Sequence, residues 1–229
     1  MDFSVRSQQP ELLDRPDITA ADTALNLQEL ECINRMLGGH AVTLDGFRTL
    51  AAGSMEITVA EVGCGGGDNL LAIQQKADPE RLSLHCIGID LNADCIRFAQ
   101  KVNWKKLPEF LTGDYRLIRF SERPDILFAS LFCHHFTDTE LIDMFRWMRT
   151  QSRSGFFIND LHRHPVAWYS IRLLTALFSR SYLVKNDAPL SVLRGFKKKE
   201  LKRLLEKAGI VRYTIQWKWA FRWLVIVPA

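Results

Sequence analysis

A short glycine-rich loop is the first part of the chain that could hold a ligand. Residues 63–67, Gly-Cys-Gly-Gly-Gly, follow the predicted strand segment 59–62, Val-Ala-Glu-Val, and a helical pattern of apolar residues begins at position 70. Glycines let a backbone adopt positive φ and approach a ligand closely, and the first N–H groups of the following helix point back toward the loop. The pattern predicts a cradle for a nucleotide cofactor, with Asp68 and Asn69 capping the helix.

A carboxylate at the end of a second predicted strand supports this interpretation. Residues 84–90 form another short apolar segment, which ends in Asp90, 27 residues after Gly63. In a βαβ unit, a carboxylate at this place can accept both ribose hydroxyls of an adenosine. The loop has Gly-x-Gly-x-Gly spacing, with Glu61 two places before it, and lacks the Gly-x-Gly-x-x-Gly spacing of dinucleotide sites. This difference favours S-adenosylmethionine over a nicotinamide cofactor.

With two further landmarks, the chain resembles the class I S-adenosylmethionine-dependent methyltransferases over roughly residues 57–227. Asp114 closes a third predicted strand, and the segment 125–131 leads into a loop with Cys133 and two histidines. The resemblance implies S-adenosylmethionine as the cofactor. The cofactor contacts that it implies are Glu61, Gly63, Cys64, Gly65, Asp90, Leu91, Gly113, Asp114, Tyr115 and Leu131.

These elements predict an α/β fold with a Rossmann-like, seven-stranded, mostly parallel methyltransferase sheet and helices on both faces. We expect one methyltransferase domain over residues 1–229. Its expected parts are a helical N-terminal cap (1–55), a cofactor-binding core (57–160), a lid inserted after the fifth strand (162–195), and the last helix with a terminal antiparallel hairpin (196–229).

Two predicted parts should cover the site. The cap contains a helix predicted over residues 18–39, with Thr19 as its N-cap, and a shorter helix over 45–52. The lid follows the predicted strand 155–161, at the carboxyl edge of the sheet, where open α/β folds bind ligands. Its apolar residues are mixed with arginines, which predicts a flap over a hydrophobic acceptor.

Several side chains at this edge could assist methyl transfer. The four histidines that follow predicted strands here are His134, His135, His162 and His164. Methyl transfer from a sulfonium is an in-line displacement, so alignment and exclusion of water matter most. A phenol acceptor also needs a base, and histidine titrates near neutral pH. The candidate bases are His134 and His162, with Arg163 or Arg194 polarising the acceptor oxygen.

The lid makes the chain similar to the small-molecule methyltransferases of quinone and phenolic-polyketide methylation. That resemblance implies methylation, at oxygen, of a small hydrophobic aromatic acceptor such as a phenol or quinol. The alternatives are carbon methylation of a similar ring, a dinucleotide-dependent oxidoreductase and a non-catalytic cofactor-binding partner. No sequence signal indicates an oligomeric state.

Composition narrows the expected setting. The net charge is only +4, and the basic run 197–207 has the spacing of an amphipathic helix, so we expect no nucleic-acid partner. Five cysteines without C-x-x-C or metal-ligand spacing predict a reduced, cytoplasmic protein without a bound metal. No run approaches the ~20 apolar residues of a membrane span, so stable membrane insertion is not expected.

Overall fold

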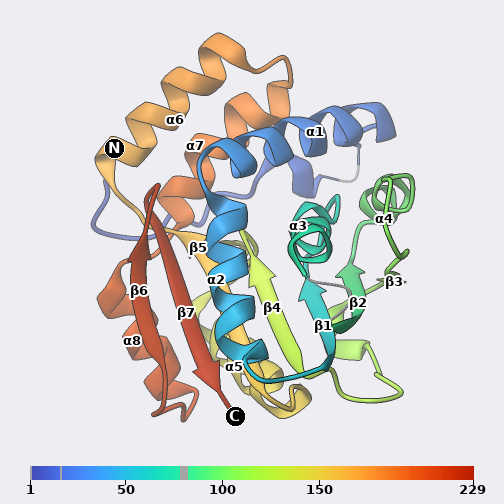
Figure 1. Cartoon of the computed structure of the whole chain (residues 1–229). Coiled ribbons are helices and arrows are strands. Elements are labelled where there is room, and N and C mark those ends of the chain that lie inside the picture. Colours follow the sequence, from blue (N-terminus) through green and yellow to red (C-terminus); the bar gives the residue numbers. More distant parts are fainter. Residues whose placement is uncertain (1, 16, 78–81) are drawn as a thin grey trace.

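A single seven-stranded sheet forms the centre of the structure, a computed structural model that describes residues 2–15, 17–77 and 82–229 (Figure 1). The strand order is β3-β2-β1-β4-β5-β7-β6, in which the first five are parallel and β7 is antiparallel to both of its neighbours. The strands are β1 (Glu56–Val62), β2 (Ser83–Asp90), β3 (Glu109–Thr112), β4 (Ile126–Ser130), β5 (Gly155–Leu161), β6 (Thr214–Lys218) and β7 (Arg222–Pro228). The predicted sheet and its terminal hairpin are confirmed.

Helices cover both faces of the sheet. They are α1 (Ala20–Met36), α2 (Gly39–Ala51), α3 (Asp68–Lys76), α4 (Ala93–Ala99), α5 (Asp138–Gln151), α6 (Pro165–Phe178), α7 (Tyr182–Arg194) and α8 (Lys198–Lys207). Three short 3₁₀ segments are η1 (Leu12–Asp14), η2 (Tyr115–Leu117) and η3 (Cys133–His135). Side chains of α5 and α8 pack on one face, and those of α2, α3 and α4 pack on the other.

The central strand β4 explains why the sheet needs both layers. All five of its residues are buried. Successive side chains of a strand point to opposite faces, and here Leu127 and Ala129 join the core under α5 and α8, whereas Ile126 and Phe128 join the core under α2 and α3. A continuous apolar run of this kind is typical of a strand in a doubly covered parallel sheet.

Helices α1, α6 and α7 lie together over the carboxyl ends of the parallel strands (Figure 1). We call these three helices the cap; α1 belongs to the predicted N-terminal cap, and α6 and α7 belong to the predicted lid. The segment 2–15, which we call the N-terminal strap, is tied to this cap. The carboxylate of Asp187 accepts hydrogen bonds from the backbone N–H groups of Leu12 (2.9 Å) and Leu13 (3.0 Å). The buried Arg6 guanidinium donates to the carbonyl oxygens of Arg194 and Phe136. The strap is therefore an ordered part of the fold.

Two helix starts show which local predictions were right. The Thr19 hydroxyl accepts a hydrogen bond from the backbone N–H of Asp22 (3.1 Å), so the predicted N-cap of α1 is confirmed. The prediction that Asp68 and Asn69 cap α3 is wrong, because Gly67, with φ of +78°, is the N-cap. Both side chains are instead used in tertiary hydrogen bonds from the first turn of α3.

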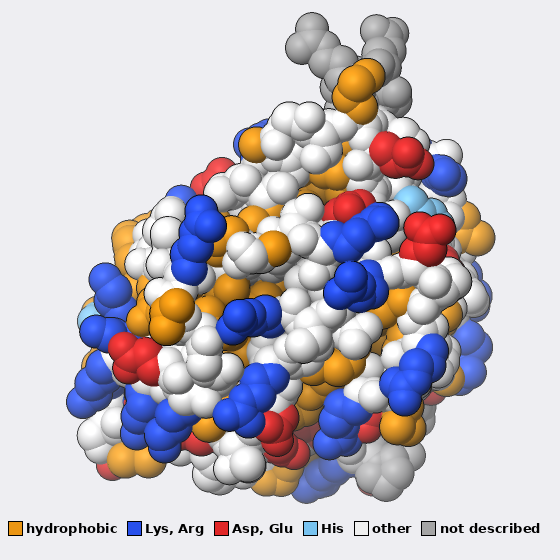
Figure 2. Space-filling model, turned by 90° about the horizontal axis from the view of Figure 1, so that it is seen from below, with side chains coloured by type: hydrophobic (Ala, Val, Ile, Leu, Met, Phe, Trp, Pro, Cys, Tyr) orange, Lys and Arg blue, Asp and Glu red, His pale blue; other side chains and the backbone are white. Residues whose placement is uncertain are grey.

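The basic helix α8 is amphipathic, as predicted, and buries Leu201, Leu204 and Leu205. Figure 2 views the end of the molecule opposite the cap, where Lys and Arg side chains are interspersed with acidic, polar and hydrophobic ones. This face therefore offers no continuous basic surface. Among the described residues, no helix has both the length and the apolar character needed to span a bilayer.

Candidate functional site

One cavity of about 870 Å³ lies between the carboxyl edge of the sheet and the cap. All ten residues predicted as cofactor contacts line it. So do His134 and His135, together with residues of α1, α6 and the strap. The cavity therefore joins the glycine loop to the histidines that follow β4.

The glycine loop forms one wall of this cavity and is held against the end of β2. The backbone N–H groups of Gly63 and Cys64 both donate to the carbonyl of Ile89, at 2.8 and 3.0 Å. Gly63 has φ of +70°, and a Cβ added to it would lie 2.1 Å from the Phe132 ring. Only glycine fits this position without displacing Phe132. Cys64 is 3% exposed, and burial raises the pKa of its thiol well above the ordinary value, so it fills space in the loop.

Asp90 is fixed at the tip of β2 by two backbone groups. Its Oδ2 accepts a hydrogen bond from the N–H of Gly65, and its Oδ1 accepts one from the N–H of Asn92, each at 2.8 Å. Burial raises the pKa of Asp90, against the lowering effect of these two hydrogen bonds. Each carboxylate oxygen can accept more than one hydrogen bond, so the fixed group can still accept a pair of ligand hydroxyls.

Glu61 supplies a buried carboxyl group at the base of the loop. Its Oε1 accepts a hydrogen bond from the Asn69 amide at 3.1 Å, and its Oε2 has no hydrogen-bond partner among the described residues. Burial, together with the nearby charge of Asp68, raises the pKa of Glu61 well above its ordinary value. A buried, half-satisfied carboxyl group is suited to a cationic ligand, which would supply the missing partner and favour ionisation.

His134 occupies the far end of the cavity between two carboxylates. Its Nδ1 lies 2.8 Å from Oδ1 of Asp160, and its Nε2 lies 3.4 Å from Oε1 of Glu11. Burial opposes charging of the ring, but the two carboxylates outweigh that effect and raise the pKa of His134 to about 9. Burial also opposes ionisation of Glu11, but the neighbouring His134 outweighs that effect and lowers the pKa of Glu11 to about 2.

The other predicted catalytic side chains do not line the cavity. His162 packs against the rings of Trp223 and Phe221, with centroid distances of 4.9 and 6.3 Å. The His164 ring caps α6 by accepting a hydrogen bond from the N–H of Val166. Desolvation lowers the pKa of His162. Of the two candidate bases, only His134 therefore faces the cavity.

Both candidate arginines bind the N-terminal region instead of facing the cavity. Arg163 is 1% exposed, pairs with Glu200 at 2.6 Å, and donates to the carbonyls of Phe3 and Gly195. Arg194 donates to the carbonyls of His134 and Gln9. Neither arginine lines the cavity. These guanidinium groups do not face the cavity because they donate hydrogen bonds to carbonyl oxygens of the strap, those of Phe3 and Gln9.

Two residues at this site were not identified from the sequence. Glu11 lies in the strap, in a stretch that has no motif. Asp160 lies on the predicted fifth strand, near its carboxyl end, which was an available signal.

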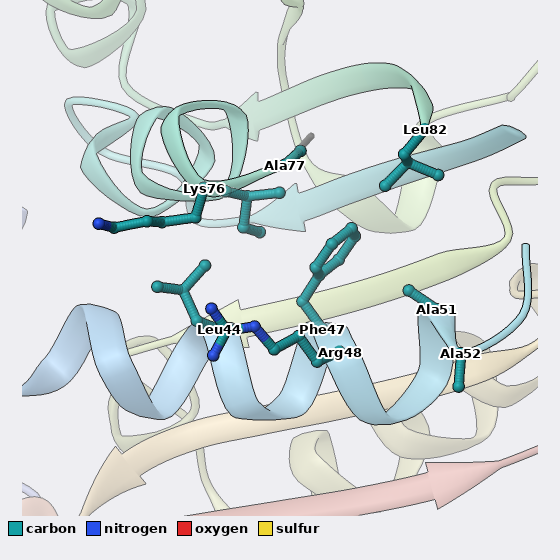
Figure 3. Close-up of a pocket in the computed structure, with 9 residues that line it drawn as sticks. Leu44, Phe47, Arg48, Ala51, Ala52, Lys76, Ala77 and Leu82 are labelled. Carbon is teal, nitrogen blue, oxygen red and sulfur yellow. The ribbon is translucent and has the colours of Figure 1, made fainter. Parts of the chain in front are cut away.

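A second, smaller cavity of about 230 Å³ lies between α2 and the end of α3 (Figure 3). Its lining is mostly aliphatic, and its charged residues are Arg48 and Lys76. None of its lining residues borders the larger cavity. No carboxylate, histidine or cysteine is among its described lining residues.

The comparisons with known proteins point to a methyltransferase domain. The family model described as "Methyltransferase domain" matches residues 59–155. No curated protein matches the sequence.

Solved methyltransferase structures share the fold at low sequence identity. The plantazolicin methyltransferase BpumL, in complex with S-adenosylhomocysteine, has a TM-score of 0.65 at 14% identity, with 92% of this chain and 96% of that chain covered. Human N-acetylserotonin methyltransferase, in complex with S-adenosylmethionine, has a TM-score of 0.63 at 15% identity, with 92% and 56% covered. Magnesium protoporphyrin IX methyltransferase from Synechocystis has a TM-score of 0.54 at 14% identity, with 83% and 79% covered.

The chain spans less than two thirds of N-acetylserotonin methyltransferase and of two further solved structures that it matches, with 56%, 60% and 66% of those chains covered. Residues 59–155 therefore match a methyltransferase domain, within a chain that has the fold of these solved methyltransferases.

Proposed function

We propose that this protein transfers the methyl group of S-adenosylmethionine to an oxygen atom of a small hydrophobic aromatic acceptor, such as a phenol or quinol. One observation carries the proposal. A single cavity of about 870 Å³ joins the ten cofactor-contact candidates to an apolar chamber that ends at His134. An in-line methyl transfer needs this arrangement, with a cofactor and an acceptor side by side and shielded from water.

The cofactor would occupy the wall formed by β1, β2 and β3. The loop from Gly63 to Gly65 would hold the methionine part, with the carboxyl group of Glu61 beneath its ammonium group. Asp90 would accept the ribose hydroxyls, and Leu91 and Asp114 would lie beside the adenine. The fixed orientation of Asp90 and the unpartnered Oε2 of Glu61 support these roles.

The acceptor would lie between α1 and α6. Apolar side chains of both helices, and of Leu37 at the C-terminal end of α1, line this part of the cavity; those of the helices are Leu30, Ile33, Ala167, Ile171 and Leu174. They suit an aromatic ring, and the chamber's polar end, at His134, suits the reacting hydroxyl group. The hydroxyl proton leaves at this end, the oxygen takes the methyl group, and S-adenosylhomocysteine remains as the other product. Among the candidate catalytic residues, we propose His134 as the group that faces the acceptor oxygen.

Other parts of the expected setting are also proposals. We propose a single domain, a small-molecule partner without nucleic acid, and a cytoplasmic location. All five cysteines are unpaired, and four of them are buried, which supports a reducing environment.

An isotope experiment tests the proposed function. Purified protein is incubated with methyl-labelled S-adenosylmethionine and a panel of phenols, quinols and alkylresorcinols, and the products are located by mass spectrometry and NMR. We expect a labelled O-methyl product. Label on a ring carbon would support carbon methylation instead, and no transfer to any acceptor in the panel would contradict the proposed acceptor class.

A further inference from the structure

We propose that Glu11, His134 and His135 form a binding site for one divalent transition-metal cation, such as Zn²⁺, at the acceptor end of the cavity. The three side chains come from the strap and from η3, and all three line the cavity. One ligand atom from each lies within 4.8 Å of the others.

The distances suit a small cation after a slight contraction. Zinc binds histidine nitrogen and carboxylate oxygen at about 2.0–2.2 Å, so two ligand atoms of a tetrahedral site lie roughly 3.4 Å apart. The His134 Nε2 lies 3.4 Å from Oε1 of Glu11. The His135 Nε2 lies 3.8 Å from Oε2 of Glu11. Both are ion-pair separations longer than an ordinary N–H···O hydrogen bond of about 2.9–3.0 Å, and the first equals the edge of such a site.

The free nitrogen of His134 is the second, independent observation. His134 is 3% exposed, and its Nε2 has no hydrogen-bond partner among the described residues. Asp160 Oδ1 lies 2.8 Å from the Nδ1 of the same ring. A bound cation would take the place of the proton on Nε2, while Nδ1 keeps its proton and donates it to this carboxylate. Metal-binding histidines commonly have such a carboxylate on the nitrogen that faces away from the metal.

The other two ligands also have outer partners. The Ser191 hydroxyl donates to Oε1 of Glu11 at 2.8 Å. The Nδ1 of His135 lies 3.6 Å from Oδ2 of Asp14. Outer partners of this kind hold a ligand in one orientation before the metal arrives, which lowers the cost of binding.

The ligand set indicates which cation would bind. Two imidazoles and one carboxylate suit Zn²⁺, Co²⁺ or Fe²⁺ better than Mg²⁺ or Ca²⁺, which prefer all-oxygen sites. Three protein ligands leave at least one coordination position open. Since the site borders the cavity, that position could take the acceptor oxygen. The catalytic part of this inference rests on the proposed function, because the cation would hold the acceptor's hydroxyl oxygen and favour loss of its proton to solvent.

Cobalt titration tests the site without any methyl acceptor. Tag-free, chelator-treated protein is titrated with Co²⁺, and visible absorption and calorimetry report coordination and stoichiometry. We expect one Co²⁺ per chain, and we expect Glu11→Gln and His135→Ala each to weaken binding at least about tenfold. His85→Ala is the matched control, because His85 lies on β2 beside Glu109 and does not line the cavity. It should bind Co²⁺ like the wild type.

S-adenosylhomocysteine binding shows that the variants remain folded. Glu11 and His135 are not among the proposed cofactor contacts, so thermal stabilisation by S-adenosylhomocysteine should be retained in both variants. Failure of the wild type to bind Co²⁺ or Zn²⁺ below about 1 mM would overturn the metal site. Unchanged Co²⁺ affinity in both ligand variants would overturn it as well. Methyl transfer by protein that binds no metal would refute the metal site and leave the proposed function standing. Co²⁺ binding without transfer to any acceptor would support the metal site and contradict the proposed function.

Discussion

Asp160 holds His134 at both its backbone and its ring. Oδ2 of Asp160 accepts a hydrogen bond from the backbone N–H of His134 at 3.2 Å, while Oδ1 lies 2.8 Å from the ring Nδ1. His134 lies shortly after β4, and Asp160 is the second-last residue of β5. These two strands are neighbours and run parallel. The sheet register therefore sets the direction of the His134 ring.

We predict that Asp160→Asn reduces turnover about 10–100-fold, because the ring loses the charged partner that fixes its orientation. The dissociation constant of S-adenosylhomocysteine should stay the same, since Asp160 does not line the cavity. Steady-state kinetics and calorimetry measure the two effects. Asp143→Asn, on the exposed face of α5, is the control. A parallel loss of cofactor affinity would mean that Asp160 supports the whole site.

Asp90→Ala should weaken S-adenosylhomocysteine binding by about 1–3 kcal/mol, because the ribose hydroxyls lose a charged acceptor. Calorimetry measures this change. Asp94→Ala provides a matched control, because Asp94 lies four residues away, pairs with Arg97 and does not line the cavity. Thermal stabilisation by S-adenosylhomocysteine but not by NAD is also expected. Equal affinities of the two variants would remove Asp90 from the cofactor site.

Glu61→Gln should stabilise the ligand-free protein at pH 8 more than at pH 5. The pKa of Glu61 in the folded protein lies well above its ordinary value of 4.5, so above pH 4.5 the unfolded chain releases a proton that the folded protein retains. The contribution of Glu61 to the free energy of unfolding of the wild type therefore decreases as pH rises. Glutamine does not ionise, so the variant lacks this decrease.

Thermal unfolding of Glu61→Gln and wild type at the two pH values checks this prediction, with the exposed Glu109→Gln as control. The same variant should bind S-adenosylhomocysteine more weakly, because the neutral amide cannot pair with the ammonium group. A stability difference that does not change with pH would show that Glu61 ionises normally.

Leu174→Asp should raise the KM for a hydrophobic acceptor about tenfold, because it places a charge where the acceptor ring would be buried. Leu174 is 40% exposed and lines the cavity from α6. Leu177→Asp is the matched control, since Leu177 is exposed on the next turn and does not line the cavity. Equal KM values for the two variants would place the acceptor elsewhere.

Arg163→Met should lower the free energy of unfolding by about 3 kcal/mol, because it leaves Glu200 without its buried partner. Urea denaturation measures this loss. Folded Arg163→Met protein should keep its KM for the acceptor, since the guanidinium binds strap carbonyls and Glu200. A specific loss of kcat in stable protein would return Arg163 to the role of polarising the acceptor oxygen.

The meeting of the ten cofactor-contact candidates in one cavity was predictable from the sequence, because these residues come in short, ordered motifs. The loop at 63–67 and the strand ending at Asp90 need only the βαβ connection to meet. The acceptor half depends on tertiary contacts. Glu11 and His134 are 123 residues apart, and no periodicity indicates that they approach each other. Arg163 was recognisable as a buried cation only once the strap carbonyls beside it were known.

The position of the strap has a consequence for synthesis and for the evolution of acceptor choice. The cofactor wall requires residues up to about position 131, whereas the strap docks on Asp187 and Arg194, which leave the ribosome later. The cap end of the cavity can therefore close only after α7 has been synthesised, later than the segments that carry residues 61–131. Under the proposed function, substitutions at Glu11, Leu13 and Asp14, the strap residues that line the cavity, would change acceptor choice and leave the glycine loop and Asp90 untouched.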